Sequence, residues 1–128
     1  MKKLFLILLA AFIVGCSTIS LTYDPVEYDR MVEISMTSEA VLKSCGDNMA
    51  LEKSVKRLDT QITHMYKHSK FIHHNTELHE IVSRLNKSSS EFSRMVQKGS
   101  VNLDFCKLQG EFFIAATERT LEAIGKRR

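Results

Sequence analysis

The sequence predicts an all-α protein, a small antiparallel bundle of about four helices closed by one disulfide. Apolar residues recur at steps of three and four along most of the chain, which is the spacing of one helix face. No segment alternates apolar and polar residues, and one proline with five glycines among 128 residues argues against a fold of strands and turns. Short connections between the predicted helices make consecutive helices antiparallel neighbours.

The first predicted helix begins at Asp24-Pro25, an N-cap acceptor followed by proline at the first helical position. Gly46-Asp47-Asn48 then interrupts the chain and separates this helix from the second. The clearest periodicity belongs to the second helix, where apolar residues alternate steps of four and three as in a heptad seam. These residues are Leu51, Val55, Leu58, Ile62 and Met65. His73-His74-Asn75 predicts the break before the third helix.

The third predicted helix is capped by Asn75 or Thr76 and closes at Lys98-Gly99, a C-terminal cap. Its apolar positions are Leu78, Val82, Leu85, Phe92 and Val96. The run Ser88-Ser89-Ser90 fits either an exposed face or a local kink. Ser100 or Asn102 opens the last helix, which extends to about Ala123.

The last helix is apolar over most of its circumference. One broad stripe contains Val101, Phe105, Leu108, Phe112, Ala115 and Ala116, and Cys106, Phe113 and Ile124 extend it sideways. We expect this stripe to face the core. Leu103, Ile114 and Leu121 fall well outside this stripe. A helix of this kind is either central in its fold or carries a second apolar face for a partner. The second interpretation makes Leu103, Ile114 and Leu121 candidate partner-binding residues.

The N-terminal segment has the composition of an export signal. Lys2 and Lys3 precede an uninterrupted apolar run of 11 residues, Leu4 to Val14. A membrane-spanning helix needs about 20 apolar residues, so this run is too short to span, but it matches the hydrophobic region of a cleaved signal. We therefore expect residues 1–15 to be removed.

Ile13-Val14-Gly15-Cys16 resembles the bacterial lipobox. The resemblance implies cleavage before Cys16, a diacylglycerol on its sulfur and an acyl chain on its new amino group; two or more chains make a stable anchor. Ser17 implies sorting to the outer membrane, with the protein on the periplasmic face. Residues 16–23 would form a lipidated tether and residues 24–128 the helical domain. The alternative is a short apolar leader followed by an accidental cysteine.

Cleavage would change both the charge and the thiol count. It removes two lysines from 18 basic residues against 15 acidic ones, so the mature net charge falls from +3 to about +1, too little for a nucleic-acid-binding surface. Cys45 and Cys106 remain. They would be buried thiols in a reducing compartment, but export favours a disulfide between them, which contributes about 4 kcal/mol in the chain-entropy model.

The residues that carry catalytic or metal chemistry are few. His64 and His68 lie four apart on one predicted helix and are weak candidates for a metal pair, although a zinc site needs a third and usually a fourth ligand. No phosphate-binding loop, nucleophile elbow or His-Glu-x-x-His motif occurs in the sequence. The sequence therefore predicts a protein that is not an enzyme and needs no cofactor or metal.

The placement of the cysteines resembles that of the type II secretion pilotins. The residues that carry this resemblance are Ala40-Val41-Leu42-Lys43-Ser44-Cys45-Gly46, Phe105-Cys106-Lys107-Leu108 and the lipobox. It implies a four-helix bundle closed by that disulfide, and a groove that binds a helical C-terminal segment of a secretin subunit. The complex would then follow the lipoprotein pathway to the outer membrane. The chain lacks the tryptophan that pilotins often carry after the second helix.

Two other functions fit the same features. A periplasmic immunity protein, an inhibitor or a phage-exclusion lipoprotein is also small, anchored, helical and closed by a disulfide. A metal sensor or carrier would use His64 and His68. The sequence thus predicts a non-catalytic protein-binding module, with a secretin as the expected partner and these two functions as alternatives.

Overall fold

The computed structural model describes residues 23–71 and 76–125 of the chain. They form α2 (Pro25–Ser44), α3 (Asn48–Lys70), α4 (Thr76–Gln97) and α5 (Leu103–Gly125). Helices hold 89% of the described residues and none of these residues lies in a strand, which confirms the predicted all-α bundle. No helix in these two ranges is long and apolar enough to cross a membrane.

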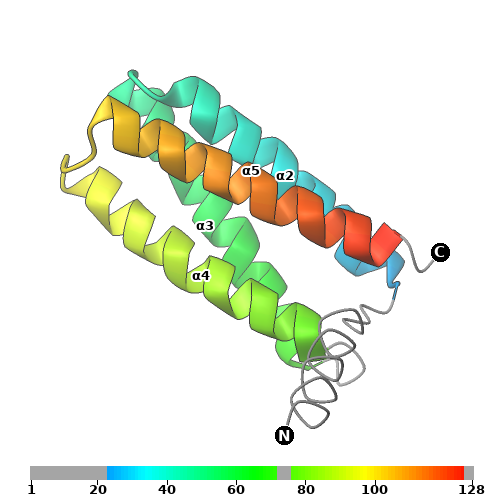
Figure 1. Ribbon diagram of the computed structural model, residues 1–128. Helices are drawn as coiled ribbons and strands as arrows, with labels where there is room; N and C mark the ends of the chain where they lie inside the picture. The colour runs from blue at the N-terminus through cyan, green and yellow to red at the C-terminus, as the bar shows by residue number, and fades with distance from the viewer. Residues whose placement is uncertain (1–22, 72–75, 126–128) are drawn as a thin grey trace, which may run out of the picture.

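The helices lie antiparallel in the spatial order α5, α2, α3, α4 (Figure 1). Extensive packing joins α5 to α2, α2 to α3, and α3 to α4. The fourth side of the bundle differs, because α4 and α5 have only slight contact although a short loop connects them. The bundle is therefore tightly packed on three sides and thinly packed on the side between α4 and α5.

The predicted signals at the first two helix ends are confirmed. The Asp24 side chain caps α2 by accepting hydrogen bonds from the backbone N–H groups of Val26 (2.8 Å) and Glu27 (3.2 Å). Gly46 has φ 97°, a conformation that glycine adopts without steric cost. Asp47 then caps α3 through the N–H of Ala50 (3.1 Å). A two-helix hairpin follows directly from these local preferences.

The connection between α4 and α5 also follows the sequence. Gly99 has φ 69° and follows the end of α4. The side chain of Asn102 caps α5 by accepting a hydrogen bond from the N–H of Phe105 at 2.8 Å. The predicted break at His73-His74-Asn75 lies outside the described residues, and α4 begins at Thr76.

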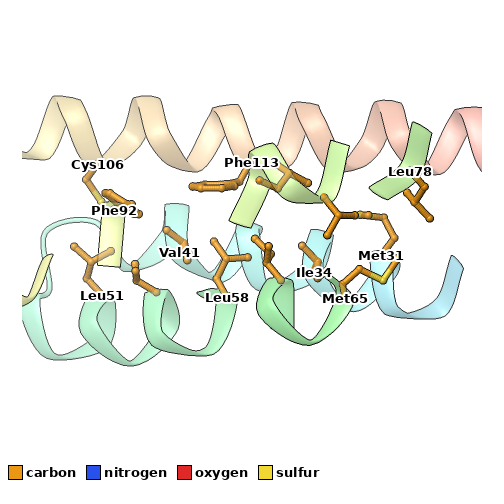
Figure 2. Packing of buried hydrophobic residues seen from close by; sticks show 14 of the residues in the cluster. Met31, Ile34, Val41, Leu51, Leu58, Met65, Leu78, Phe92, Cys106 and Phe113 are labelled. Atoms are coloured by element: carbon orange, nitrogen blue, oxygen red, sulfur yellow. The ribbon is translucent and has the colours of Figure 1, made fainter. Parts of the chain in front are cut away.

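The core is made of the heptad positions of α3 and their equivalents on the other helices. Leu51, Val55, Leu58, Ile62 and Met65 are all buried, as are Leu78, Val82, Leu85 and Phe92 of α4. Figure 2 shows several of these side chains with Met31, Ile34 and Val41 of α2 and with Phe113 of α5. The rings of Phe92 and Phe113 lie 6.4 Å apart, so aromatic packing joins α4 and α5 deep inside the bundle.

Polar side chains hold α4 to α3. The hydroxyl groups of Ser89 and Ser90 donate hydrogen bonds to the Asp59 carboxylate at 2.8 and 3.0 Å. Thr63 donates to the Asn86 side chain at 3.0 Å. The serine run therefore continues α4 without a break and forms part of a helix interface. These hydrogen bonds therefore fix the position of α4 relative to α3, and none of them joins α4 to α5.

The prediction for the core face of α5 was right for the sideways extension of the stripe, Cys106, Phe113 and Ile124, and wrong for its centre. Its buried residues are Cys106, Gly110, Phe113, Thr117, Thr120 and Ile124, whereas Leu108 and Phe112 of the predicted stripe are 62% and 47% exposed. Threonine can occupy this face because its hydroxyl bonds to the preceding turn. Thr117 donates to the carbonyl of Phe113, and Thr120 to that of Ala116, both at 2.8 Å. Small or polar residues, Gly110, Thr117 and Thr120, thus make up half of the core face, beside Cys106, Phe113 and Ile124.

The small residues of α5 allow a close approach to α2. A Cβ atom on Gly110 would lie 3.0 Å from the Cβ and 3.1 Å from the Cα of Leu42. One helical turn away, the predicted disulfide between Cys45 and Cys106 is confirmed, with a Cα–Cα distance of 5.9 Å. The close packing at Gly110 and the Cys45–Cys106 disulfide together fix the start of α5 against the end of α2.

We expect Gly110→Ala to destabilise the bundle. The added methyl group meets the backbone of α2, and overpacking of this kind costs about 1–3 kcal/mol, more than the 0.5–1 kcal/mol that alanine gains in a helix. Gly125→Ala is the matched control, because its nearest neighbour, Tyr28, would be 3.9 Å away. Urea unfolding measures both free energies. Equal stability of the two variants would contradict the close approach.

The disulfide closes a loop with a sequence separation of 61. In the chain-entropy model such a cross-link contributes about 4 kcal/mol, so reduction should lower the free energy of unfolding by an amount of this order. Urea unfolding with and without dithiothreitol measures the change. The Cys45→Ser/Cys106→Ser variant is the control and should not respond to dithiothreitol. An unchanged wild-type midpoint under reduction would show that the cross-link does not stabilise the bundle.

Candidate functional site

The side of the bundle between α4 and α5 contains the strongest candidate site. A shallow hollow of about 100 Å³ opens there. Ser88, Glu91, Phe92 and Met95 of α4 and Phe105 and Gln109 of α5 line it. The rings of Phe92 and Phe105 lie 6.2 Å apart and connect the hollow to the core. We call this thinly packed side, with its hollow, the α4–α5 seam.

Phe105 lines the hollow, and two further apolar residues share its face of α5. Phe105, Leu108 and Phe112 follow each other at steps of three and four, so they share one face of the helix. Phe105 is half-buried, whereas Leu108 and Phe112 are 62% and 47% exposed. The ring of Phe112 packs edge-on against the buried Phe113, with 5.3 Å between the ring centres. These three residues form what we call the α5 strip.

The α5 strip is held in place by the core behind it. Phe105 and Phe112 each contact a buried ring, Phe92 and Phe113 respectively, so the strip is anchored to the core and cannot turn inward without displacing those rings. Large apolar side chains exposed side by side mark a surface for another apolar surface. Because Leu108 and Phe112 remain exposed beside each other, an added helix could bury them.

The residues predicted to bind a partner lie elsewhere on α5. Leu103 is 48% exposed and lies beside Gly46, at the end of α2. Ile114 and Leu121 are partly buried, and Leu121 packs against the core. The spacing of 11 and 7 residues places all three on one face, which is not that of the α5 strip. Their role in binding stays a prediction, and the structure does not bring them together with the strip.

The three histidines that the structure describes, His64, His68 and His79, do not assemble a metal site. His64 is exposed, and His68 is partly buried with no hydrogen-bond partner for its Nε2 atom among the described residues. Within those residues no group of three His, Cys, Asp or Glu side chains could hold a metal ion. His79 lies within hydrogen-bond distance of the Ser69 hydroxyl (Nδ1–Oγ 2.9 Å) and stacks on Tyr66. The predicted lipidation site, Cys16, lies outside the described residues.

Comparison of the chain with protein-family models, with curated proteins and with solved structures gives no significant match. The candidate function therefore depends on the features of this chain.

The histidine pair gives a direct test of metal binding. Two ligands cannot complete the three or four positions that zinc sites use in proteins, so zinc titrated into the protein should give no saturable heat. The variant His64→Ala/His68→Ala is the control and should give the same calorimetric trace. A one-to-one isotherm that disappears in this variant would contradict the interpretation and revive the metal-carrier alternative.

Proposed function

We propose that this protein is a lipid-anchored outer-membrane lipoprotein whose periplasmic bundle binds a helical segment of another protein and performs no catalysis. The pilotin-like version of this function, in which the segment is the C-terminal helix of a secretin, fits the features best. The observation that carries the proposal is the exposed α5 strip beside a seam that α4 does not close.

The shape of the seam favours a helix as its occupant. The strip from Phe105 to Phe112 extends about 10 Å along α5, at 1.5 Å per residue, which corresponds to two turns. A short amphipathic helix presents apolar residues at the same steps of three and four. Full burial of a Leu or Phe side chain contributes about 1.5–3 kcal/mol. Since Leu108 and Phe112 are roughly half exposed, completing their burial supplies about half of that for each.

The position of the strip suits an anchored protein. The tether would join the bundle at Asp24, where α2 begins. The start of α5, which contains Phe105 of the hollow and Cys106 of the disulfide, lies at the opposite end of the bundle, beside the end of α2 (Figure 1). The 20 residues of α2 separate these two ends by about 30 Å. A bundle tethered at Cys16 would therefore hold the hollow away from the lipid surface, where a periplasmic segment can reach it.

We expect Leu108→Gln/Phe112→Gln to lose the partner without losing the fold. Each side chain is already about half buried, so each substitution should lower the free energy of unfolding by about 1 kcal/mol and leave the disulfide-closed bundle folded. The matched control, Met49→Gln/Phe71→Gln, removes one aliphatic and one aromatic side chain that are also exposed, at the two ends of α3. Detergent extraction of the envelope followed by pull-down measures the amount of secretin that co-purifies with each variant.

The wild type and the control should retain the secretin, and the strip variant should lose it and reduce the amount of secretin in the outer membrane. Normal secretin assembly in cells without this gene would contradict the pilotin-like function. Under the immunity alternative, a toxin would co-purify in place of the secretin, and cells without the gene would be sensitive to it.

A further inference from the structure

A second hollow lies on the opposite side of the bundle, between α2 and α3. It has a volume of about 510 Å³. Glu33, Met36 and Ala40 of α2 and Lys53, Ser54 and Arg57 of α3 border it. A smaller hollow of about 270 Å³ continues it past Glu33 to Arg30 and His64. We call the two together the α2–α3 groove.

Small side chains create this groove. Ala40 and Ser54 leave space between two helices that otherwise pack tightly. The hydroxyl of Ser54 lies 3.1 Å from that of Ser44, which in turn donates to the carbonyl of Ala40, so these polar groups are satisfied locally. Met36 lies along the same opening and is 65% exposed. An exposed methionine is a flexible apolar contact that adapts to the shape of a partner.

The groove has a positive rim. Lys53 and Arg57 are exposed and lie one helical turn apart on α3, and Arg30 borders the other end from α2. Among the residues that the structure describes, Glu33 is the only acidic one that lines either hollow. From Arg30 to Ala40 the groove follows α2 for about 15 Å, which is the length of about ten helical residues. Its charge and length therefore match a short segment with several carboxylates.

We propose that the α2–α3 groove binds an acidic amphipathic segment of a second partner protein. An apolar side chain of this segment packs on Met36 and Ala40, and carboxylates one turn apart pair with Lys53 and Arg57. The spatial order of the helices places this groove on the side of the bundle away from the α4–α5 seam. The protein then holds two partners at once and acts as an adaptor between them.

A protein segment fits the groove better than a lipid headgroup does. Met36 and Ala40 lie 12 and 16 residues along the chain from Asp24, which is about 18 and 24 Å along α2. The part of the groove that Lys53 borders is thus distant from the end of the bundle to which the tether is attached. A phospholipid of the anchoring membrane would meet the other end first.

Site-specific cross-linking of the full-length lipidated protein in its own cells tests this proposal. The photo-reactive amino acid p-benzoyl-phenylalanine replaces Ala40, which lines the groove, or Thr60, which is exposed on α3 outside it. The position-40 protein is also made with Lys53→Glu/Arg57→Glu, and with Lys56→Glu/Lys67→Glu as a control of equal charge change on exposed residues that do not line the groove. Thermal unfolding monitors the fold of every variant.

We expect an adduct from position 40 and none from position 60, and mass spectrometry should place the cross-link in a segment rich in Asp and Glu. Reversal of both rim charges should reduce the adduct about tenfold, whereas the control should leave it unchanged. Absence of an adduct at position 40, or an adduct that survives Lys53→Glu/Arg57→Glu, would overturn the proposal. A lipid adduct or an adduct with a second copy of this chain would also overturn it.

The cross-linking result for the α2–α3 groove can be distinguished from the secretin pull-down result for the α4–α5 seam. Lys53→Glu/Arg57→Glu should leave secretin pull-down unchanged, and Leu108→Gln/Phe112→Gln should leave the position-40 adduct unchanged. Failure of one site therefore does not mimic failure of the other.

Discussion

The close approach of α5 to α2 is the contact on which the rest of the arrangement depends. Gly110 lets the two backbones meet at Leu42, and the disulfide from Cys45 to Cys106 holds the same end together. Helix α4 is oriented by a different set of interactions, the hydrogen bonds from Ser89 and its neighbour to Asp59 of α3. Because α5 is fixed to α2 and α4 to α3, contact between α4 and α5 is slight. The seam follows from these two separate attachments.

Larger side chains on α4 and α5 could have closed the thinly packed side of the bundle, but the sequence does not place them there. Phe92 and Phe113 fill the interior behind the seam, so the core is complete without the outer residues of α5. The α5 strip is therefore free to contact another molecule at little cost to the stability of the bundle. A fold of this kind can keep an apolar surface exposed because its stability depends on other contacts, in particular the disulfide and the α3 heptad seam.

Much of the bundle could be predicted from the sequence, because its signals were local. Adjacent residues alone determine the caps at Asp24 and Asp47 and the positive-φ glycines. The heptad positions of α3 are all apolar, so its core face could be read directly from the sequence. The prediction for α5 missed the centre of its core face because that face contains Gly110, Thr117 and Thr120, which hydropathy does not identify as buried. The recurrence of small residues at steps of three and four was the signal that could have identified this face.

The candidate sites were less predictable than the helices. Phe105, Leu108 and Phe112 were visible in the sequence, but their assignment to the surface required the position of α2, which the disulfide and Gly110 determine in three dimensions. The α2–α3 groove depends on the space left by Ala40 and Ser54 on two helices, and no pattern within one helix encodes such a space. The anchor stays a prediction, which depends on a local motif ending at Cys16.

Binding of a helix at the α4–α5 seam can be measured by hydrogen–deuterium exchange of the bundle with and without the C-terminal segment of the proposed secretin partner. We expect the added segment to slow exchange in the parts of α4 and α5 that border the seam, around residues 88–95 and 105–112, and to leave α2 and α3 unchanged. Protection confined to α2 and α3, or no protection at saturating segment, would contradict binding at the seam.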